Sequence, residues 1–186
     1  MRIRLSLLVA CVVTLLLVGA RPAFAQGDEM KGDFAFSYAV LREGGLKMTL
    51  PGGYVAALAG DLKKSWRIVA EFGGSYKVVH FPGAGSVRVA VIDYVGGLRF
   101  APDVKMKVRP YVQFLAGGGR ESQHLIGTNG TAAINGVVAQ PGFGLDFKIT
   151  RMLDGRAQMD YRAFHSGGST YNDYRVSFGV VFPFGR

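Results

Sequence analysis

The sequence predicts an all-β fold, an eight-stranded antiparallel up-and-down transmembrane β-barrel, and three observations support this prediction. Apolar and polar residues alternate along most of the chain, longer and shorter connections follow each other in turn, and the two faces of the segments differ in composition. Tyr174 to Phe184 shows the alternation most clearly: its even positions are all apolar or aromatic, whereas its odd positions include Arg175, Ser177 and Gly179. These 11 residues match the roughly 9–11 that a tilted strand needs to cross a bilayer.

The N-terminus has the pattern of a cleaved targeting segment. Arg2 and Arg4 supply a basic start, Leu5 to Ala20 form an apolar core, and Ala23 to Ala25 match a cleavage site. We therefore expect a signal peptide over 1–25.

The remaining chain is long enough for one domain. We expect a short polar periplasmic leader over 26–32 and a barrel domain over 33–186. The single cysteine, Cys11, lies in the targeting segment, and a lipobox reading is disfavoured because the apolar run continues to Val18. The mature chain then has no disulfide.

Eight alternating segments follow the leader. They lie near 33–41, 52–60, 65–76, 87–100, 108–117, 137–149, 156–164 and 174–184. The longer connections are expected at 42–51, 77–86, 118–136 and 165–173, and the shorter ones at 61–64, 101–107 and 150–155. Long external loops and short periplasmic turns alternate in this way in bacterial outer-membrane barrels.

The two faces indicate which side points inward. Small residues such as Ala35, Gly73 and Gly144 recur on the face without aromatics, and they suit the narrow interior of an eight-stranded barrel. Aromatic residues recur at the strand ends, as membrane interfaces favour. The predicted lipid-facing and aromatic-belt residues are Phe34, Trp66, Tyr76, Phe100, Phe147, Tyr161, Tyr174, Phe178, Phe182 and Phe184. The same alternation is compatible with a soluble lipocalin-like carrier, whose apolar face would point inward.

Charge gives little support to a nucleic-acid partner. The net charge of +9 falls to +6 without the targeting segment, and the basic residues are scattered singly along the strands. The mature sequence also has no uninterrupted apolar run long enough for a transmembrane helix.

At this point the sequence resembles the small bacterial outer-membrane β-barrel proteins of the OmpA and OmpX type. The resemblance covers 32–186 and lies in the targeting segment, the eight alternating segments, the last strand, Gly96 to Phe100, and Gln140 to Asp146. It implies export to a Gram-negative outer membrane, contact with outer-membrane lipid and lipopolysaccharide, insertion by the barrel-assembly machinery, and a monomer with porin-like architecture in the cell envelope.

The inward-facing charges form the first candidate site. A packed salt-bridge network that fills the lumen is favoured over a narrow pore, because side chains fill the interior of a barrel with eight strands. The predicted network consists of Arg67, Glu71, Asp93, Arg99, Asp146, Lys148, Asp160, Arg162 and Arg175.

A lipid-modifying enzyme of the lipid A deacylase type is the main alternative. His165 and Ser166 are adjacent, with Asp160 or Asp173 nearby in sequence, but deacylase-type barrels carry the two residues two apart on a strand. We therefore expect no enzyme and no catalytic residues. We also expect no cofactor and no metal, since His80, His124 and His165 fall on separate loops.

The longest predicted loop, 118–136, is the third candidate. It contains Arg120, Glu121, His124 and Ile126, and it would be carried outward on a rigid barrel. The sequence thus favours a non-catalytic outer-membrane protein with a structural or surface-interaction role.

Overall fold

The computed structural model describes residues 31–81, 85–102, 104, 106–127 and 130–185. The predicted signal peptide and nearly all of the predicted leader lie outside these residues, so both stay predictions. No helix in the described part of the chain is long and apolar enough to cross a membrane.

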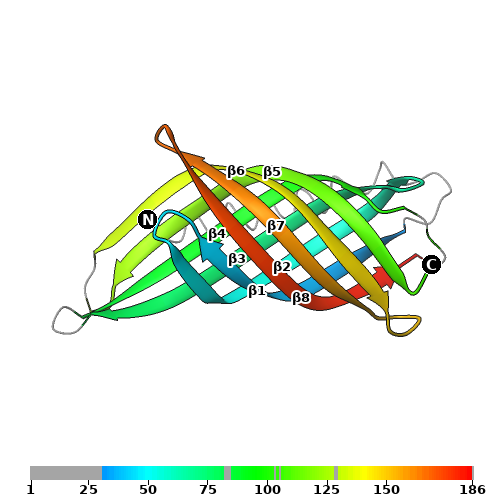
Figure 1. Cartoon of the computed structure of the whole chain (residues 1–186), viewed down its shortest axis with the longest axis horizontal. Helices are drawn as coiled ribbons and strands as arrows, with labels where there is room; N and C mark the ends of the chain where they lie inside the picture. Colours follow the sequence, from blue (N-terminus) through cyan, green and yellow to red (C-terminus); the bar gives the residue numbers. More distant parts are fainter. Residues whose placement is uncertain (1–30, 82–84, 103, 105, 128–129, 186) are drawn as a thin grey trace, which may run out of the picture. The chain divides into compact units, whose positions relative to one another are not determined.

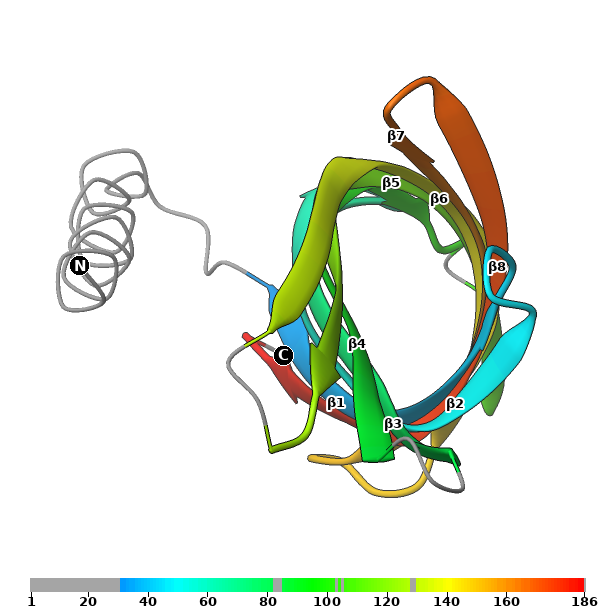
Figure 2. The ribbon, with the colours of Figure 1, turned by 90° about the vertical axis from the view of Figure 1, so that its left-hand side faces the viewer.

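Eight antiparallel strands form a closed barrel in sequence order, and the last pairs with the first (Figure 1). Viewed along the barrel, the strands form one continuous ring (Figure 2). The strands are β1 (Gly32–Glu43), β2 (Met48–Lys63), β3 (Trp66–Phe81), β4 (Gly85–Phe100), β5 (Val108–Leu125), β6 (Thr131–Lys148), β7 (Asp154–Ser166) and β8 (Ser169–Phe184). The predicted fold class and strand number are therefore confirmed.

The two ends of the barrel are distinguished by the strand connections that each carries. We call the end with Gly32 and Phe184, which are register partners, the terminal end. It also carries the connections at 64–65, 101–107 and 149–153. The opposite, distal end carries those at 44–47, 126–130 and 167–168.

The predicted long connections at the distal end are wrong, because the strands continue through much of them. β5 and β6 pair without interruption from Val108–Phe147 out to His124–Thr131, so most of 118–136 is a hairpin rather than a loop. The glycines in this segment do not indicate a loop. The ring of Tyr94 lies over Gly118, and any side chain at residue 118 would overlap that ring. Between β7 and β8, Gly167 and Gly168 both have positive φ, as the tightest right-twisting hairpin turn requires.

The faces of the strands have the transmembrane arrangement. The outward face exposes aromatic and aliphatic side chains, whereas the inward face buries aspartate, glutamate, glutamine and arginine together with small residues. A soluble lipocalin-like barrel would show the reverse, so that alternative is wrong.

The structure places the predicted belt residues on the outward face, where all but the partly buried Tyr161 are exposed. Towards the terminal end, the rings of Trp66 and Phe100 lie 5.2 Å apart between centroids. Towards the distal end, the rings of Tyr161 and Tyr174 lie 5.4 Å apart. Tyr38, Tyr54 and Tyr94 lie on the same outward face and are exposed, although they were not among the predicted belt residues. Contact of these rings with lipid headgroups stays a prediction.

Candidate functional site: the charged barrel interior

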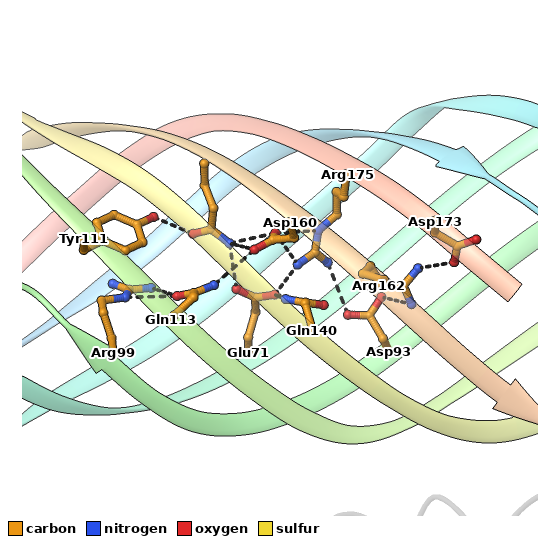
Figure 3. A network of polar contacts seen from close by, with 11 residues as sticks. Glu71, Asp93, Arg99, Tyr111, Gln113, Gln140, Asp160, Arg162, Asp173 and Arg175 are labelled. Carbon is orange, nitrogen blue, oxygen red and sulfur yellow. Dashed lines mark hydrogen bonds and ion pairs between the residues drawn. The ribbon is translucent and has the colours of Figure 1, made fainter. Parts of the chain in front are cut away.

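Arg175 lies at the centre of the interior and contacts carboxylates from three other strands. Its guanidinium bonds to Glu71 of β3, to Asp160 of β7 through Nη2 at 2.9 Å, and to Asp93 of β4 through Nη1 at 3.2 Å. Figure 3 shows Arg175 between these side chains. All four residues are at most 4% exposed. The cross-section is therefore closed by one cation shared among three acids.

Glutamine side chains fill the space around this centre. Gln140 donates to Glu71 at 2.8 Å, and Gln158 donates to Glu71 at 3.2 Å and to Asp160 at 2.9 Å. Gln113 donates to Asp160 at 3.2 Å. Gln158 satisfies Glu71 Oε2 and Gln113 satisfies Asp160 Oδ1, two oxygens that Arg175 does not contact. The other amide bonds add a second donor to oxygens that Arg175 already contacts, and such hydrogen bonding is the condition for keeping charges away from water.

A second layer lies towards the distal end. Arg162 pairs with Asp173 at 2.9 Å and with Asp93 at 3.2 Å, which links it to the centre. Asp173 also accepts a hydrogen bond from the Gly44 backbone at 3.0 Å, and so ties the β1–β2 turn to β8. An apolar cluster of Leu41, Leu50, Val89 and Val91 also lies in the interior, and Val89 and Val91 line a small pocket together with Glu43.

A third layer lies towards the terminal end. Arg156 bonds to Asp146 at 2.7 and 3.0 Å and approaches Asp33 at 3.4 Å. Arg67 pairs with Asp33 and, at 2.6 Å, with Asp61.

Tyr111 joins this third layer to the centre. Its hydroxyl donates to Gln158 at 2.6 Å, and its ring faces the guanidinium carbons of Arg99 and Arg156 at 4.2 and 5.1 Å from the ring centroid. Arg99 in turn donates to Gln113 at 2.8 and 3.0 Å. The contacts drawn in Figure 3 run from Arg99 and Tyr111 through the centre to Asp173. Arg156 of the third layer joins them through the ring of Tyr111.

The structure brings together all but one of the predicted lumen charges. Arg67 is half-buried near the terminal end, and the other predicted charges are buried, except Lys148. Lys148 falls on an inward-facing position of the alternation, but it is the last residue of β6 and its side chain is exposed at the end of the barrel.

Sequence reasoning missed several members of the network. Asp33 and Arg156 lie on predicted strands at inward positions, so following the alternation one step further would have found them. Asp154 and Asp173 fell in predicted connections, which the strands in fact include. Gln113, Gln140 and Gln158 were left out of the predicted network because it included only charged side chains.

The alternative catalytic residues are not assembled into a nucleophile and base. The Ser166 hydroxyl donates to the Asn135 carbonyl at 2.7 Å, and His165 Nδ1 contacts Thr170 Oγ1 at 2.9 Å. Asp160 and Asp173 are buried inside the barrel, whereas His165 is exposed. His80 and His124 make similar cross-strand contacts with Ser86 and Thr131.

No group of three or more His, Cys, Asp or Glu side chains in the described part of the chain could hold a metal ion.

A closed eight-stranded ring, an apolar outer face and a charged, filled interior together define a small transmembrane β-barrel of the outer-membrane type. No protein-family model matches the chain, and no curated protein matches it in sequence.

Solved structures share the fold. The crystal structure of Neisserial surface protein A matches with a TM-score of 0.64 and 14% identity over 86% of this chain and 100% of that one. The crystal structure of Ail from Yersinia pestis, in complex with the heparin analogue sucrose octasulfate, matches with a TM-score of 0.55 and 15% identity over 84% and 100%. The N-terminal β-barrel domain of Pseudomonas aeruginosa OprF matches with a TM-score of 0.51 and 18% identity over 86% and 100%. At these identities the likeness is one of fold.

Proposed function

We propose that this chain is a non-catalytic protein of the bacterial outer membrane with a structural or surface-interaction role, inserted as a monomer with both termini in the periplasm. The observation that carries the proposal is the network around Arg175, which closes the cross-section with contacts to Glu71, Asp93 and Asp160. A barrel filled in this way keeps its shape and offers its ends to other molecules rather than a passage.

The distal end supports the surface-interaction part of the proposal. The β5–β6 hairpin continues past the outward apolar positions of β5 and exposes Arg120, Leu125 and Ile126. Of the proteins with this fold, Ail is described as an attachment invasion locus protein, and its structure holds a sulfated sugar. We place this chain in the same broad class, with the distal hairpins as the contact surface.

Lipopolysaccharide is the first partner that this surface would meet. Arg88 of β4 and Arg120 of β5 are both exposed. Arg120 is the register partner of Ile92, and Arg88 lies four residues further towards the distal end. Guanidinium groups at this level suit the phosphates of an anionic lipid. During biogenesis the barrel-assembly machinery is the second partner.

Site-specific labelling of intact cells tests the location and the orientation together. Because Cys11 lies in the predicted signal peptide, Ile126→Cys and Met152→Cys each give the mature chain one thiol, at the distal and the terminal end respectively. Both side chains are exposed, at 43% and 79%. A membrane-impermeant maleimide is expected to label Ile126→Cys in intact cells, and Met152→Cys only after the outer membrane is permeabilised.

The two variants serve as controls for each other, since their thiols are both accessible in the folded chain. Labelling of Met152→Cys alone in intact cells would reverse the proposed orientation. Protection of both thiols until permeabilisation, with the protein in the soluble periplasmic fraction, would overturn the proposed location.

A further inference from the structure

The terminal end of the barrel contains a cavity of about 560 Å³ that the interior network leaves open. Gly32 and Phe184 lie at its rim, and Tyr111 lines it from the inside. By volume it accommodates roughly 20 water molecules, taking about 30 Å³ for each. It is thus large enough for a small solute.

The charged lining of the cavity is predominantly basic. Four cations oppose two carboxylates, a formal excess of +2, and the residues are Lys31, Lys64, Arg67, Arg109, Asp61 and Asp146.

Several of these cations retain free donor capacity. Lys31 and Lys64 form no ion pair within the described residues. Arg109 pairs with Asp154 through Nη2, and its buried Nε has no hydrogen-bond partner in the described structure. Arg67 is paired on both sides, with Asp33 and Asp61, so it contributes charge more than free donors.

Behind the cavity wall, two buried guanidiniums add to the positive potential. Arg99 and Arg156 face the ring of Tyr111 and are 1% and 3% exposed. Arg99 has no carboxylate within 4.0 Å in the described structure and relies on the Gln113 amide. The Nη1 atoms of Arg99 and Arg156 both lack partners among the described residues. A buried cation without a carboxylate is costly, and an anion nearby would reduce that cost.

We propose that this cavity is a binding site for a phosphate monoester dianion. The charge of such a ligand equals the excess on the lining, and its oxygens suit both the guanidinium fork of Arg109 and the point charges of Lys31 and Lys64. The phosphoryl group reaches the site from a soluble ester in the periplasm or from the headgroup of phosphatidic acid in the inner leaflet. Both sources present the same chemistry to the lining.

Calorimetric titration of the folded barrel in zwitterionic detergent micelles at low salt tests the site. Glycerol 3-phosphate is the soluble probe, and phosphatidic acid mixed into the micelles is the lipid probe. We expect saturable binding of at least one probe by the unaltered barrel. The double variant Lys31→Gln/Lys64→Gln removes two exposed lysines without ion pairs, so the fold is retained, and it should weaken binding about tenfold or more, which is about 1.4 kcal/mol.

Lys107→Gln/Lys148→Gln is the matched control, since both lysines are exposed at the terminal end and neither lines the cavity. It removes the same charge, and its affinity should stay within about twofold of the unaltered barrel's, well under the tenfold step of 1.4 kcal/mol. Equal weakening in both double variants would overturn the site, because it would show diffuse attraction to a basic end. Absence of binding for both probes would also overturn it. Binding of phosphatidic acid alone supports the site and identifies the lipid as its source.

Discussion

We call the part of the barrel in which the outward-facing side chains are apolar the apolar band. Within it, the two faces of each strand are stabilised in different ways, and Arg175 and Phe178 of β8 show the contrast. Phe178 points outward and is 61% exposed, whereas Arg175 points inward and is 1% exposed. The outer face is stabilised by transfer into hydrocarbon, which depends on area and tolerates exchange among apolar residues. The inner face depends on specific partners, since each charge is retained only while its neighbours are present. The two faces should therefore fail in different ways when altered.

Removal of the central cation should have the largest effect. Arg175→Met leaves Glu71, Asp93 and Asp160 without the guanidinium they share. Breaking a buried ion pair from one side costs about 3–5 kcal/mol, so we expect the free energy of unfolding to fall by about this amount. Urea unfolding in micelles, followed by the fluorescence of the single tryptophan, Trp66, measures the loss.

Arg42→Met is the matched control, because Arg42 is exposed, forms no ion pair within the described residues and donates a hydrogen bond to Thr49 at 3.2 Å. It should change the free energy of unfolding by less than about 0.5 kcal/mol. If Arg175→Met does not fold, addition of Glu71→Gln should restore folding in part, since it removes one unpaired carboxylate. An Arg175→Met barrel as stable as the original would contradict the central role of this network.

A charge on the outer face should cost somewhat less, with a strong dependence on depth. Phe178 lies near the middle of the outward apolar run of β8, between Tyr174 and Phe184. Phe178→Arg is expected to lower the free energy of unfolding by about 2–4 kcal/mol in bilayers. Thr170→Arg, which lies on the same face but beyond Tyr174, should cost about 1 kcal/mol or less. Equal costs at the two positions in vesicle unfolding experiments would show that the assigned band is misplaced.

The sequence predicted these faces well, because an error in a strand boundary does not change which face each residue of the strand is assigned to. Arg175 and Phe178 fall on the correct faces whether β8 begins at residue 169 or 174. The extent of the strands was harder to predict, because alternation of apolar and polar residues stops where the membrane stops. β5 continues to Leu125 through Gly117 to Gly119 on backbone pairing alone, and neither composition nor turn residues report that pairing.

The partners within the interior could not be predicted at all. Arg175 reaches Glu71 and Asp93 across the barrel from strands far away in the sequence. Which inward residues meet depends on the stagger between strands, and alternation within one strand carries no information about it. For the same reason the basic cavity at the terminal end, which residues from several strands line, was not foreseen.

Beyond the apolar band the contrast between the faces should weaken, and Glu121 tests this. Glu121 has inward parity on β5 and follows the exposed Arg120, so it lies outside the membrane-spanning part of the strand. It borders a small pocket of about 90 Å³ with Glu43, Val89 and Ile134, and its buried Oε1 has no hydrogen-bond partner in the described structure.

The pKa of Glu121 gives this test a defined pH range. Burial raises the pKa from its ordinary 4.5 to about 7; the nearby carboxylates of Glu43 and Asp173 add to the rise, and Arg162 opposes it. The folded state therefore binds the proton more tightly than the unfolded chain. The free energy of unfolding should fall as the pH rises from about 4.5 to about 7. Because the side chain is partly exposed, we expect a loss of about 1 kcal/mol rather than the full linkage value.

Glu121→Gln should remove this part of the pH dependence, since the amide has no proton to lose. The comparison is made between the slopes of the two unfolding profiles, because every other titratable group is common to both chains and its contribution cancels in the difference. Identical slopes would show that water reaches Glu121 freely and that the inner face is already ordinary surface at this level. A shallower slope in the variant would show that the inward-facing groups remain poorly hydrated beyond the membrane. The exposure of side chains on the outer face cannot indicate this hydration.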